Sequence, residues 1–116
     1  MLLVDDNVDA AQMTAALLEL DGCEVRVAGD GPAALLAASE YRPDVVLLDI
    51  GLPTLNGFEV CRALRARPEH RHTVIVALSG YGDAQSVAAA AAAGFDGHLT
   101  KPADPQQIAH WLSRSR

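Results

Sequence analysis

Three stretches of the chain are apolar without interruption: residues 1–4 (MLLV), 45–48 (VVLL) and 74–78 (VIVAL). Runs without polar alternation are typical of strands that are covered on both faces, as in a parallel sheet flanked by helices. Residues 24–28 alternate charged and apolar side chains, which predicts a strand nearer the sheet edge. Residues 95–100 favour a fifth short strand. The pattern therefore predicts five strands.

Each predicted strand is followed by a segment with helical signals. Apolar residues recur at helical spacing from Val8, and Gly22 is a typical helix end. Pro32 is accepted only in a first helical turn, and the alanine run before Gly94 has high helix propensity. We expect helices over the ranges 8–22, 32–40, 58–67, 83–93 and from 104 onward, with a loop over 51–57 before the third of them.

Strands that alternate with helices through short loops predict an α/β fold. The expected architecture is a flavodoxin-like, doubly wound, five-stranded parallel sheet in the order 2-1-3-4-5, with five helices on its two faces as a three-layer sandwich. A length of 116 residues predicts one domain, 1–116. The first strand is short and stops abruptly at Asp5 and Asp6, so it looks trimmed, and we expect residues to be missing upstream.

Acidic residues follow the first and third predicted strands. Asp5 and Asp6 come directly after residues 1–4, and Asp49 ends the run 45–48. These strands are neighbours in the expected order, so the three carboxylates should meet at the edge of the sheet where ligands bind in such folds. Converging carboxylates repel one another unless they hold a proton or a cation. Oxygen ligands favour a hard divalent ion, which predicts a Mg²⁺ (or Mn²⁺) site.

Two further polar residues end strands at the same edge. Ser79 follows the fourth strand and Lys101 the fifth. A hydroxyl donor and an ammonium group suit stabilisation of a phosphoryl group during transfer, with Asp49 as the nucleophile that forms an acyl phosphate. Each residue also allows a structural interpretation. The paired acids could form a solvated turn and a helix cap, Ser79 could be a turn serine, and Lys101 a surface charge.

Composition and charge argue against several classes of protein. Fifteen acidic against nine basic residues give a net charge of −6, and no block of Lys or Arg is present, so direct binding to nucleic acid is not expected. No apolar run approaches the roughly 18 residues of a membrane span, and no signal peptide opens the chain, which predicts a cytoplasmic domain. Cys23 and Cys61 lack partners at metal-ligand spacing and are expected to be reduced structural thiols.

Four motifs in order carry a resemblance over essentially the whole chain. LLVDDN, PDVVLLDIGLP, VIVALSG and HLTKP resemble the receiver domain of bacterial two-component response regulators. The resemblance implies that Asp49 is the phosphoacceptor and that Ser79 and Lys101 contact the phosphoryl group. It implies a metal-binding set of Asp5, Asp6, Asp49 and the backbone carbonyl of Gly51.

The resemblance also implies partners and an output face. The phosphoryl donor would be a histidine kinase or a histidine phosphotransfer protein. The fourth helix (83–93), fifth strand (95–100) and fifth helix (from 104) would form the output face, and any homodimer through it is expected to be weak. The variants HLTKP and ALSGYG look more like receivers fused to hybrid sensor kinases than like DNA-binding regulators. A fused kinase or effector domain is therefore expected.

Two positions near Lys101 bear on the switch. Receivers usually have a cis peptide bond before the proline that follows the lysine, and in this chain that proline is Pro102. They usually carry Tyr or Phe three residues before the lysine, where this chain has His98. The smaller, titratable ring is either a switch residue with weaker or pH-dependent coupling to Ser79, or an idle imidazole.

Two other functions compete with a phosphorylation switch. A small phosphohydrolase of the haloacid dehalogenase type also uses a strand-end aspartate, but that family wants a second acid two residues later, where Gly51 stands. A degenerate receiver would only dock partners, and the intact acids, hydroxyl and lysine argue against it. We therefore expect a phosphoacceptor domain that catalyses only its own phosphorylation and slow dephosphorylation.

Overall fold

The computed structural model describes residues 1–52, 55–80, 84–101 and 104–114. Its strands are β1 (Leu2–Val4), β2 (Arg26–Ala28), β3 (Val45–Asp49), β4 (Val74–Ser79) and β5 (Gly97–Thr100). Its helices are α1 (Val8–Leu20), α2 (Gly31–Tyr41), α3 (Gly57–Arg65), α4 (Ala84–Ala93) and α5 (Pro105–Arg114), with a short 3₁₀ turn η1 (Pro68–His70) between α3 and β4.

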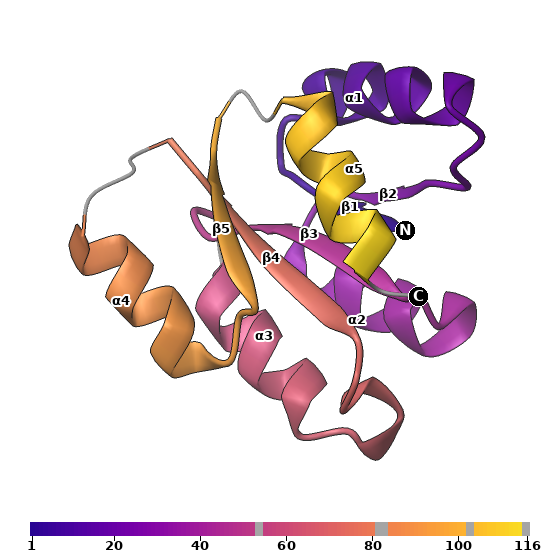
Figure 1. Ribbon diagram of the computed structural model, residues 1–116. Helices are drawn as coiled ribbons and strands as arrows, with labels where there is room; N and C mark the ends of the chain where they lie inside the picture. The colour runs from indigo at the N-terminus through magenta and orange to yellow at the C-terminus, as the bar shows by residue number, and fades with distance from the viewer. Residues whose placement is uncertain (53–54, 81–83, 102–103, 115–116) are drawn as a thin grey trace.

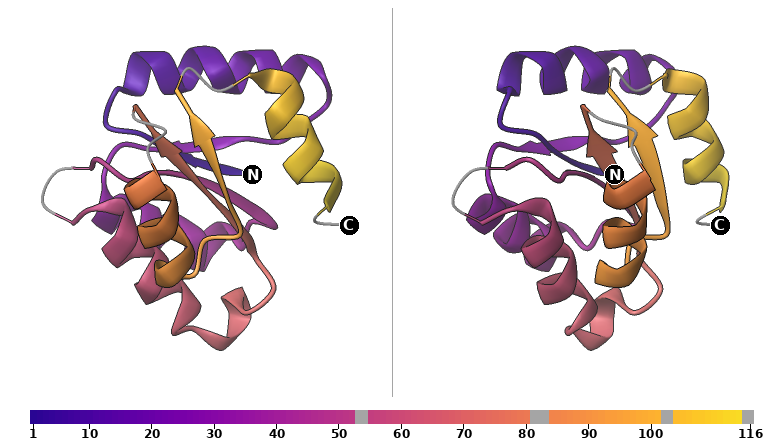
Figure 2. Two further views of the ribbon diagram at one scale, coloured as in Figure 1. Left: turned by 60° about the vertical axis from the view of Figure 1, so that its left-hand side comes forward. Right: turned by 90° about the vertical axis from the view of Figure 1, so that its left-hand side faces the viewer.

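The strands form one parallel sheet in the order β2-β1-β3-β4-β5. Helices α1 and α5 cover one face of the sheet, and α2, α3 and α4 cover the other (Figures 1 and 2). The predicted strand order, the five helices and the three layers are confirmed. The charged strand β2 lies at the edge, as its alternating pattern predicted.

The central strands are buried on both faces because each alternate side chain enters a different core. On β3, Val46 and Leu48 pack with buried residues of α2, α3 and α4, whereas Val45 and Leu47 pack with residues of α1 and α5. All five residues of β3 are buried. An uninterrupted apolar run is the pattern that such a strand requires, and it ends at Asp49 at the rim of the sheet.

Several element boundaries differ from the prediction by one or two residues, and two of these differences have a clear physical reason. Helix α3 ends at Arg65 instead of residue 67, because the residue before a proline is disfavoured in helical geometry and Arg67 adopts an extended φ/ψ of −93°/127° before Pro68. Strand β5 begins at Gly97 instead of residue 95. Phe95 is buried and meets Phe58 edge to face, with ring centroids 6.2 Å apart, so it belongs to the contact between α3 and the turn after α4.

Both cysteines are free thiols. Cys61 is fully buried in the core beneath α3, and burial raises the pKa of its thiol to about 11. A thiol with so high a pKa is almost entirely protonated at neutral pH and is unreactive, which confirms the structural role predicted for it. No helix in the described parts of the chain is long and apolar enough to cross a membrane.

His70 is buried in η1, with 1% of its surface exposed, although it stands in a segment rich in charged residues. Its Nδ1 lies 3.3 Å from the Thr73 hydroxyl. Its Nε2 has no hydrogen-bond partner among the described residues. An imidazole in this position is favoured in its neutral form, because a charged ring would lose hydration without gaining an ion pair.

The burial of His70 is expected to make the protein less stable as the pH falls. Burial lowers the pKa of His70; Glu69 opposes this, and Arg67 and Arg42 reinforce it. The folded state then binds fewer protons than the unfolded state. Stability present at neutral pH is therefore lost below the ordinary histidine pKa of about 6.5, at up to about 1.4 kcal/mol per pH unit.

Urea unfolding between pH 5 and 8 tests this effect of His70. The pH dependence of stability should be shallower in His70→Gln than in the wild type, whereas His72→Gln, a variant of an exposed histidine, should keep the wild-type dependence. Parallel curves for wild type and His70→Gln would contradict this.

Candidate functional site at the carboxyl ends of the strands

The register of the sheet brings the candidate site residues to one edge. Val4 pairs with Leu48, so Asp5 and Asp49, the residues that follow them, lie at the ends of neighbouring strands. Beyond β3, Asp49 pairs with Leu78 of β4, next to Ser79. The backbone N–H of Lys101 donates to the carbonyl of Ser79 at 2.8 Å, which extends the β4–β5 pairing by one residue. The convergence predicted from the strand ends is thus present in the fold.

Lys101 joins the two buried acids of the site. Its Nζ lies 2.7 Å from Asp49 Oδ2 and 3.1 Å from Asp5 Oδ2. Both carboxylates are buried, whereas about a third of the lysine side chain is exposed. Burial alone would lower the pKa of Lys101, but its hydrogen bonds with Asp49 and Asp5 outweigh burial, and its pKa is raised. Lys101 is therefore held as a cation between two anions.

The other oxygens of these two carboxylates accept backbone hydrogen bonds. Asp49 Oδ1 accepts from the N–H of Gly51 at 2.8 Å, and Asp5 Oδ1 accepts from the N–H of Asn7 at 3.0 Å. The cap of α1 is Asn7, whose Oδ1 accepts from the N–H of Ala10 at 3.1 Å. The paired acids are therefore not the cap of the first helix, and their carboxylates remain part of the site.

The acid cluster fits a hard divalent cation. Asp5, Asp6 and Asp49 each offer a carboxylate oxygen, and these oxygens lie within 4.8 Å of one another. Asp5 and Asp49 are buried and Asp6 is exposed, so one side of the cluster faces solvent. An oxygen-only donor set with an open side suits Mg²⁺, which keeps several waters and accepts oxygens of a phosphoryl group. Within the described ranges, this is the only group of three or more such side chains so close together.

Gly57 fixes the start of α3 against the site. A Cβ at position 57 would lie 2.4 Å from the carbonyl oxygen of Asp49, closer than real contacts allow. The N–H of Gly57 donates to the carbonyl of Ile50 at 3.4 Å. Helix α3 begins directly against the backbone that carries Asp49, and only a residue without a side chain fits there. The sequence predicts only a loop at Gly57 and contains no signal for this role.

Ser79 and His98 lie beside each other on adjacent strands. His98 pairs with Ala77, two residues before Ser79, so both side chains point to the face covered by α2, α3 and α4. His98 Nε2 lies 3.1 Å from Ser79 Oγ. Ser79 is buried and His98 is half-buried. The predicted switch pair is therefore in direct contact, whereas Pro102 lies outside the described residues.

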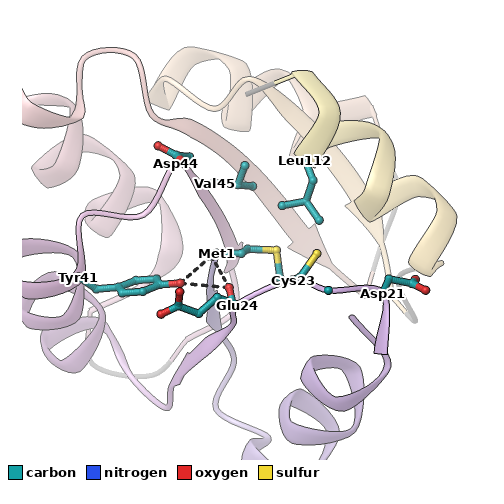
Figure 3. Close-up of a pocket in the computed structure, with 9 residues that line it drawn as sticks. Met1, Asp21, Cys23, Glu24, Tyr41, Asp44, Val45 and Leu112 are labelled. Atoms are coloured by element: carbon teal, nitrogen blue, oxygen red, sulfur yellow. Dashed lines mark hydrogen bonds between the residues drawn. The ribbon is translucent and has the colours of Figure 1, made fainter. Parts of the chain in front are cut away.

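Clefts open at both ends of the sheet. One of about 300 Å³ lies between α1 and the site and is lined by Leu3, Asp5, Asn7, Ala10, Ala11, Thr14 and Lys101. Another, of about 310 Å³, lies at the amino ends of β1 and β3 (Figure 3). There the Met1 ammonium donates to the Glu24 carbonyl at 2.7 Å and lies 3.1 Å from the Tyr41 hydroxyl. The cleft with the converging acids and lysine is the one at the carboxyl ends.

A doubly wound α/β domain with acids and a lysine gathered at the carboxyl ends of its strands defines the class of protein. The chain belongs to the response regulator receiver domain family, whose family model matches residues 1–113. Among solved structures, chemotaxis protein CheY4 of Vibrio cholerae matches with a TM-score of 0.91 and 33% identity, over 99% of this chain and 96% of that one. A putative response regulator from Chloroflexus aurantiacus matches with a TM-score of 0.90 and 32% identity, over 98% and 93%.

Two curated relatives are longer than this chain. The DNA-binding response regulator MtrA of Mycobacterium tuberculosis is 40% identical over 108 residues, which are 93% of this chain and 46% of MtrA. The response regulator PleD of Caulobacter vibrioides is 40% identical over 107 residues, 90% of this chain and 23% of PleD. The chain thus spans less than half the length of these relatives. It is a receiver domain of the response regulator signalling family, consistent with a phosphoacceptor function in two-component signalling.

Proposed function

We propose that Asp49 accepts a phosphoryl group from a histidine kinase or a histidine phosphotransfer protein. One observation carries the proposal: the buried carboxylate of Asp49 ends the central strand, Lys101 lies 2.7 Å away, and Asp5 and Asp6 lie close enough to share a cation. A carboxylate oxygen of Asp49 attacks phosphorus, the P–N bond to the donor imidazole breaks, and an acyl phosphate forms.

The residues around Asp49 would lower the barrier by holding charge. Asp5, Asp6 and Asp49, with the backbone carbonyl of Gly51, would bind Mg²⁺ or Mn²⁺, which neutralises the phosphoryl oxygens when it is bound. Lys101 is already beside Asp49 Oδ2, so its ammonium needs only a small movement to reach a phosphoryl oxygen on that carboxylate. Ser79 would donate its hydroxyl proton to another phosphoryl oxygen. Positioning and charge stabilisation are most of what phosphoryl transfer requires.

The acyl phosphate would act on the face formed by α4, β5 and α5. Among the described side chains of α4, only Ala90 and Ala93 are buried, and both are small. Because the buried side chains in this described part of α4 are only methyl groups, it has little apolar area to lose when it moves, so a small change in free energy can shift it. Ser79 and His98 lie between Asp49 and α4 and would couple the two. A weak homodimer through this face is part of the proposal.

Dedicated hydrolase activity is not favoured by the site. Gly51 occupies the position two residues after Asp49 where a dehalogenase-type phosphohydrolase needs a general acid. Its N–H donates to Asp49 Oδ1, but a glycine has no side chain to protonate a leaving group. The domain would therefore catalyse only its own phosphorylation and a slow dephosphorylation.

Beryllofluoride with Mg²⁺, a mimic of the acyl phosphate, is expected to bind at Asp49 and shift amide NMR signals in three regions. These regions surround Asp49, Ser79 and His98, because the mimic recruits the Ser79 hydroxyl and its effect passes to β5. Mg²⁺ alone should shift signals near Asp5, Asp6 and Asp49, with smaller changes at His98. Unchanged signals in all three regions with beryllofluoride would contradict the proposal.

The partners of this receiver domain depend on which other domains it is fused to. MtrA is named a DNA-binding response regulator, whereas the motifs HLTKP and ALSGYG favour a receiver fused to a hybrid sensor kinase. We propose the hybrid arrangement, with the fused kinase or a phosphotransfer protein as the phosphoryl donor in the cytoplasm. The full open reading frame tests it, and an effector domain downstream with no kinase core would contradict it.

A further inference from the structure

Arg65, the last residue of α3, connects this helix to three neighbouring segments of the chain. Its Nε donates to the carbonyl of Gly94 at 2.9 Å, and its Nη1 donates to the carbonyls of His70 at 3.0 Å and Thr73 at 2.7 Å. Its Nη2 forms an ion pair with Asp96 at 2.7 Å. A guanidinium group has several N–H donors in a fixed plane, so it can hold several acceptors in one arrangement. The turn after α4 is therefore tied to α3, to η1 and to the start of β4.

Asp96 extends this connection into the sheet. Its Oδ2 also accepts from the N–H of Ile75 at 2.8 Å, and its own N–H donates to the carbonyl of Ile75 at 2.7 Å. An ion pair as exposed as this one would contribute little alone, because solvent screens it. Here both partners also bind backbone groups, and Phe95 between Gly94 and Asp96 is buried. Residues 94–96 are thus held by polar and apolar contacts together.

The helix that carries Arg65 is itself firmly placed. Helices α3 and α4 lie side by side on the same face of the sheet (Figures 1 and 2). The first residue of α3, Gly57, lies directly against the backbone of Asp49, and Val60 and Leu64 are fully buried. Moving α3 would expose this apolar surface to water, so the helix is a fixed support for its neighbour.

The described part of α4 is held less tightly with distance from Gly94. Ala90 and Ala93 are buried, whereas Val87 is exposed. A groove of about 170 Å³ separates this part of α4 from β5, lined by Val87, Ala90, Ala91, Phe95, Asp96, Gly97 and His98. One wall of the groove therefore belongs to α4, and the other includes the residues that Arg65 holds in place.

We infer that Arg65 makes the C-terminal end of α4 a pivot, so that the change at the output face is a rotation of α4 about Gly94 that alters the width of this groove. The inference rests on the proposed function of Asp49, and it adds which part of the output face moves and which part stays fixed. Val87 moves with the helix, whereas residues 94–96 keep their contacts with α3 and β4.

Hydrogen exchange in the protein without a phosphoryl mimic tests whether Arg65 holds this end of α4. In Arg65→Met the amides of Ile75 and Asp96 should exchange at least about 10-fold faster than in the wild type, because the network that covers them opens locally. Arg62→Met, at an exposed position of the same helix, should keep the wild-type rates. Asp96→Asn keeps an oxygen for the N–H of Ile75 and loses the ion pair, so its effect should be smaller. Wild-type exchange rates in Arg65→Met would overturn the inference.

NMR with beryllofluoride and Mg²⁺ tests whether this end is a pivot. Residual dipolar couplings should show that α4 changes its orientation relative to the sheet more than α3 does. The rings of Phe58 and Phe95, whose centroids lie 6.2 Å apart, should keep their mutual NOEs in the wild type. In Arg65→Met, and to a smaller extent in Asp96→Asn, these NOEs should weaken when beryllofluoride binds, because the end of α4 is then free to move.

The possible failures of the NMR experiment are distinguishable. If the wild type binds beryllofluoride and α4 keeps its orientation, or if the NOEs between Phe58 and Phe95 are lost, the pivot is wrong and the proposed function of Asp49 stands. NOEs that persist equally in Arg65→Met and the wild type would also overturn the pivot alone. If the wild type does not bind beryllofluoride, the proposed function and the inference fall together.

Discussion

Asp49→Asn is expected to reduce covalent labelling by acetyl phosphate with Mg²⁺ to background, a loss of at least about 10³-fold. The substitution removes the attacking carboxylate and keeps its size, so the β3–α3 corner should stay folded. Oδ1 of an asparagine can still accept from the N–H of Gly51, the contact that holds Asp49 in the wild type. Phosphate incorporation measured by intact-protein mass spectrometry, with circular dichroism as the check on folding, reads the result.

A matched control separates the loss of the nucleophile from the loss of one negative charge. Asp44 is exposed and directly precedes β3, at the opposite end of the strand from Asp49. Asp44→Asn should label like the wild type. A hydroxylamine-labile phosphate that persists in Asp49→Asn would show that another acid of the cluster, Asp5 or Asp6, is the acceptor.

The strand ends explain why the site could be predicted from the sequence. The run 45–48 has no polar residue, so it had to be a strand buried on both faces, and the next residue, Asp49, had to emerge at the rim. The same reasoning applied to Asp5, Ser79 and Lys101, because parallel strands present their carboxyl ends to one edge. The pattern of apolar residues and the order of the strands were sufficient to predict which residues meet at the site, and side-chain geometry was not needed.

The burial of the segment around His70 could not be predicted, because it depends on tertiary contacts of residues that show no repeating pattern of apolar positions. The segment around His70 is rich in charged residues, yet Arg65 draws it inward by donating to the carbonyls of His70 at 3.0 Å and Thr73 at 2.7 Å. The same guanidinium donates to the carbonyl of Gly94, at the end of α4, at 2.9 Å. An arginine at a helix end has no sequence pattern that distinguishes this role from an exposed charge.

The position of Lys101 between two carboxylates could not be predicted from the sequence either. The pattern placed a lysine at the rim, but not between Asp5 and Asp49 with a hydrogen bond to each. The contact between Ser79 Oγ and His98 Nε2 could not be predicted either, since it depends on the rotamers of both side chains. The fold follows from the chain's periodicity, whereas the state of the site depends on side-chain contacts that the periodicity does not encode.

Lys101→Met is expected to lower the free energy of unfolding by about 2 kcal/mol and the rate of phosphorylation by about 100-fold. The first effect arises because two buried carboxylates lose the cation between them, and the lysine's one-third exposure reduces the cost below that of a fully buried pair. The second arises because the phosphoryl oxygens lose a fixed positive charge.

Mg²⁺ affinity in Lys101→Met should fall much less than the phosphorylation rate, since Asp5, Asp6 and Asp49 all remain. The sequence has no other lysine, so the control is Arg62→Met, which removes a positive charge from an exposed position on α3 and should change stability by no more than about 0.5 kcal/mol. Urea unfolding, phosphorylation rates and Mg²⁺ titrations on the three proteins separate the effects. A loss of Mg²⁺ affinity as large as the loss of rate would mean that Lys101 organises the metal site instead of stabilising the phosphoryl group.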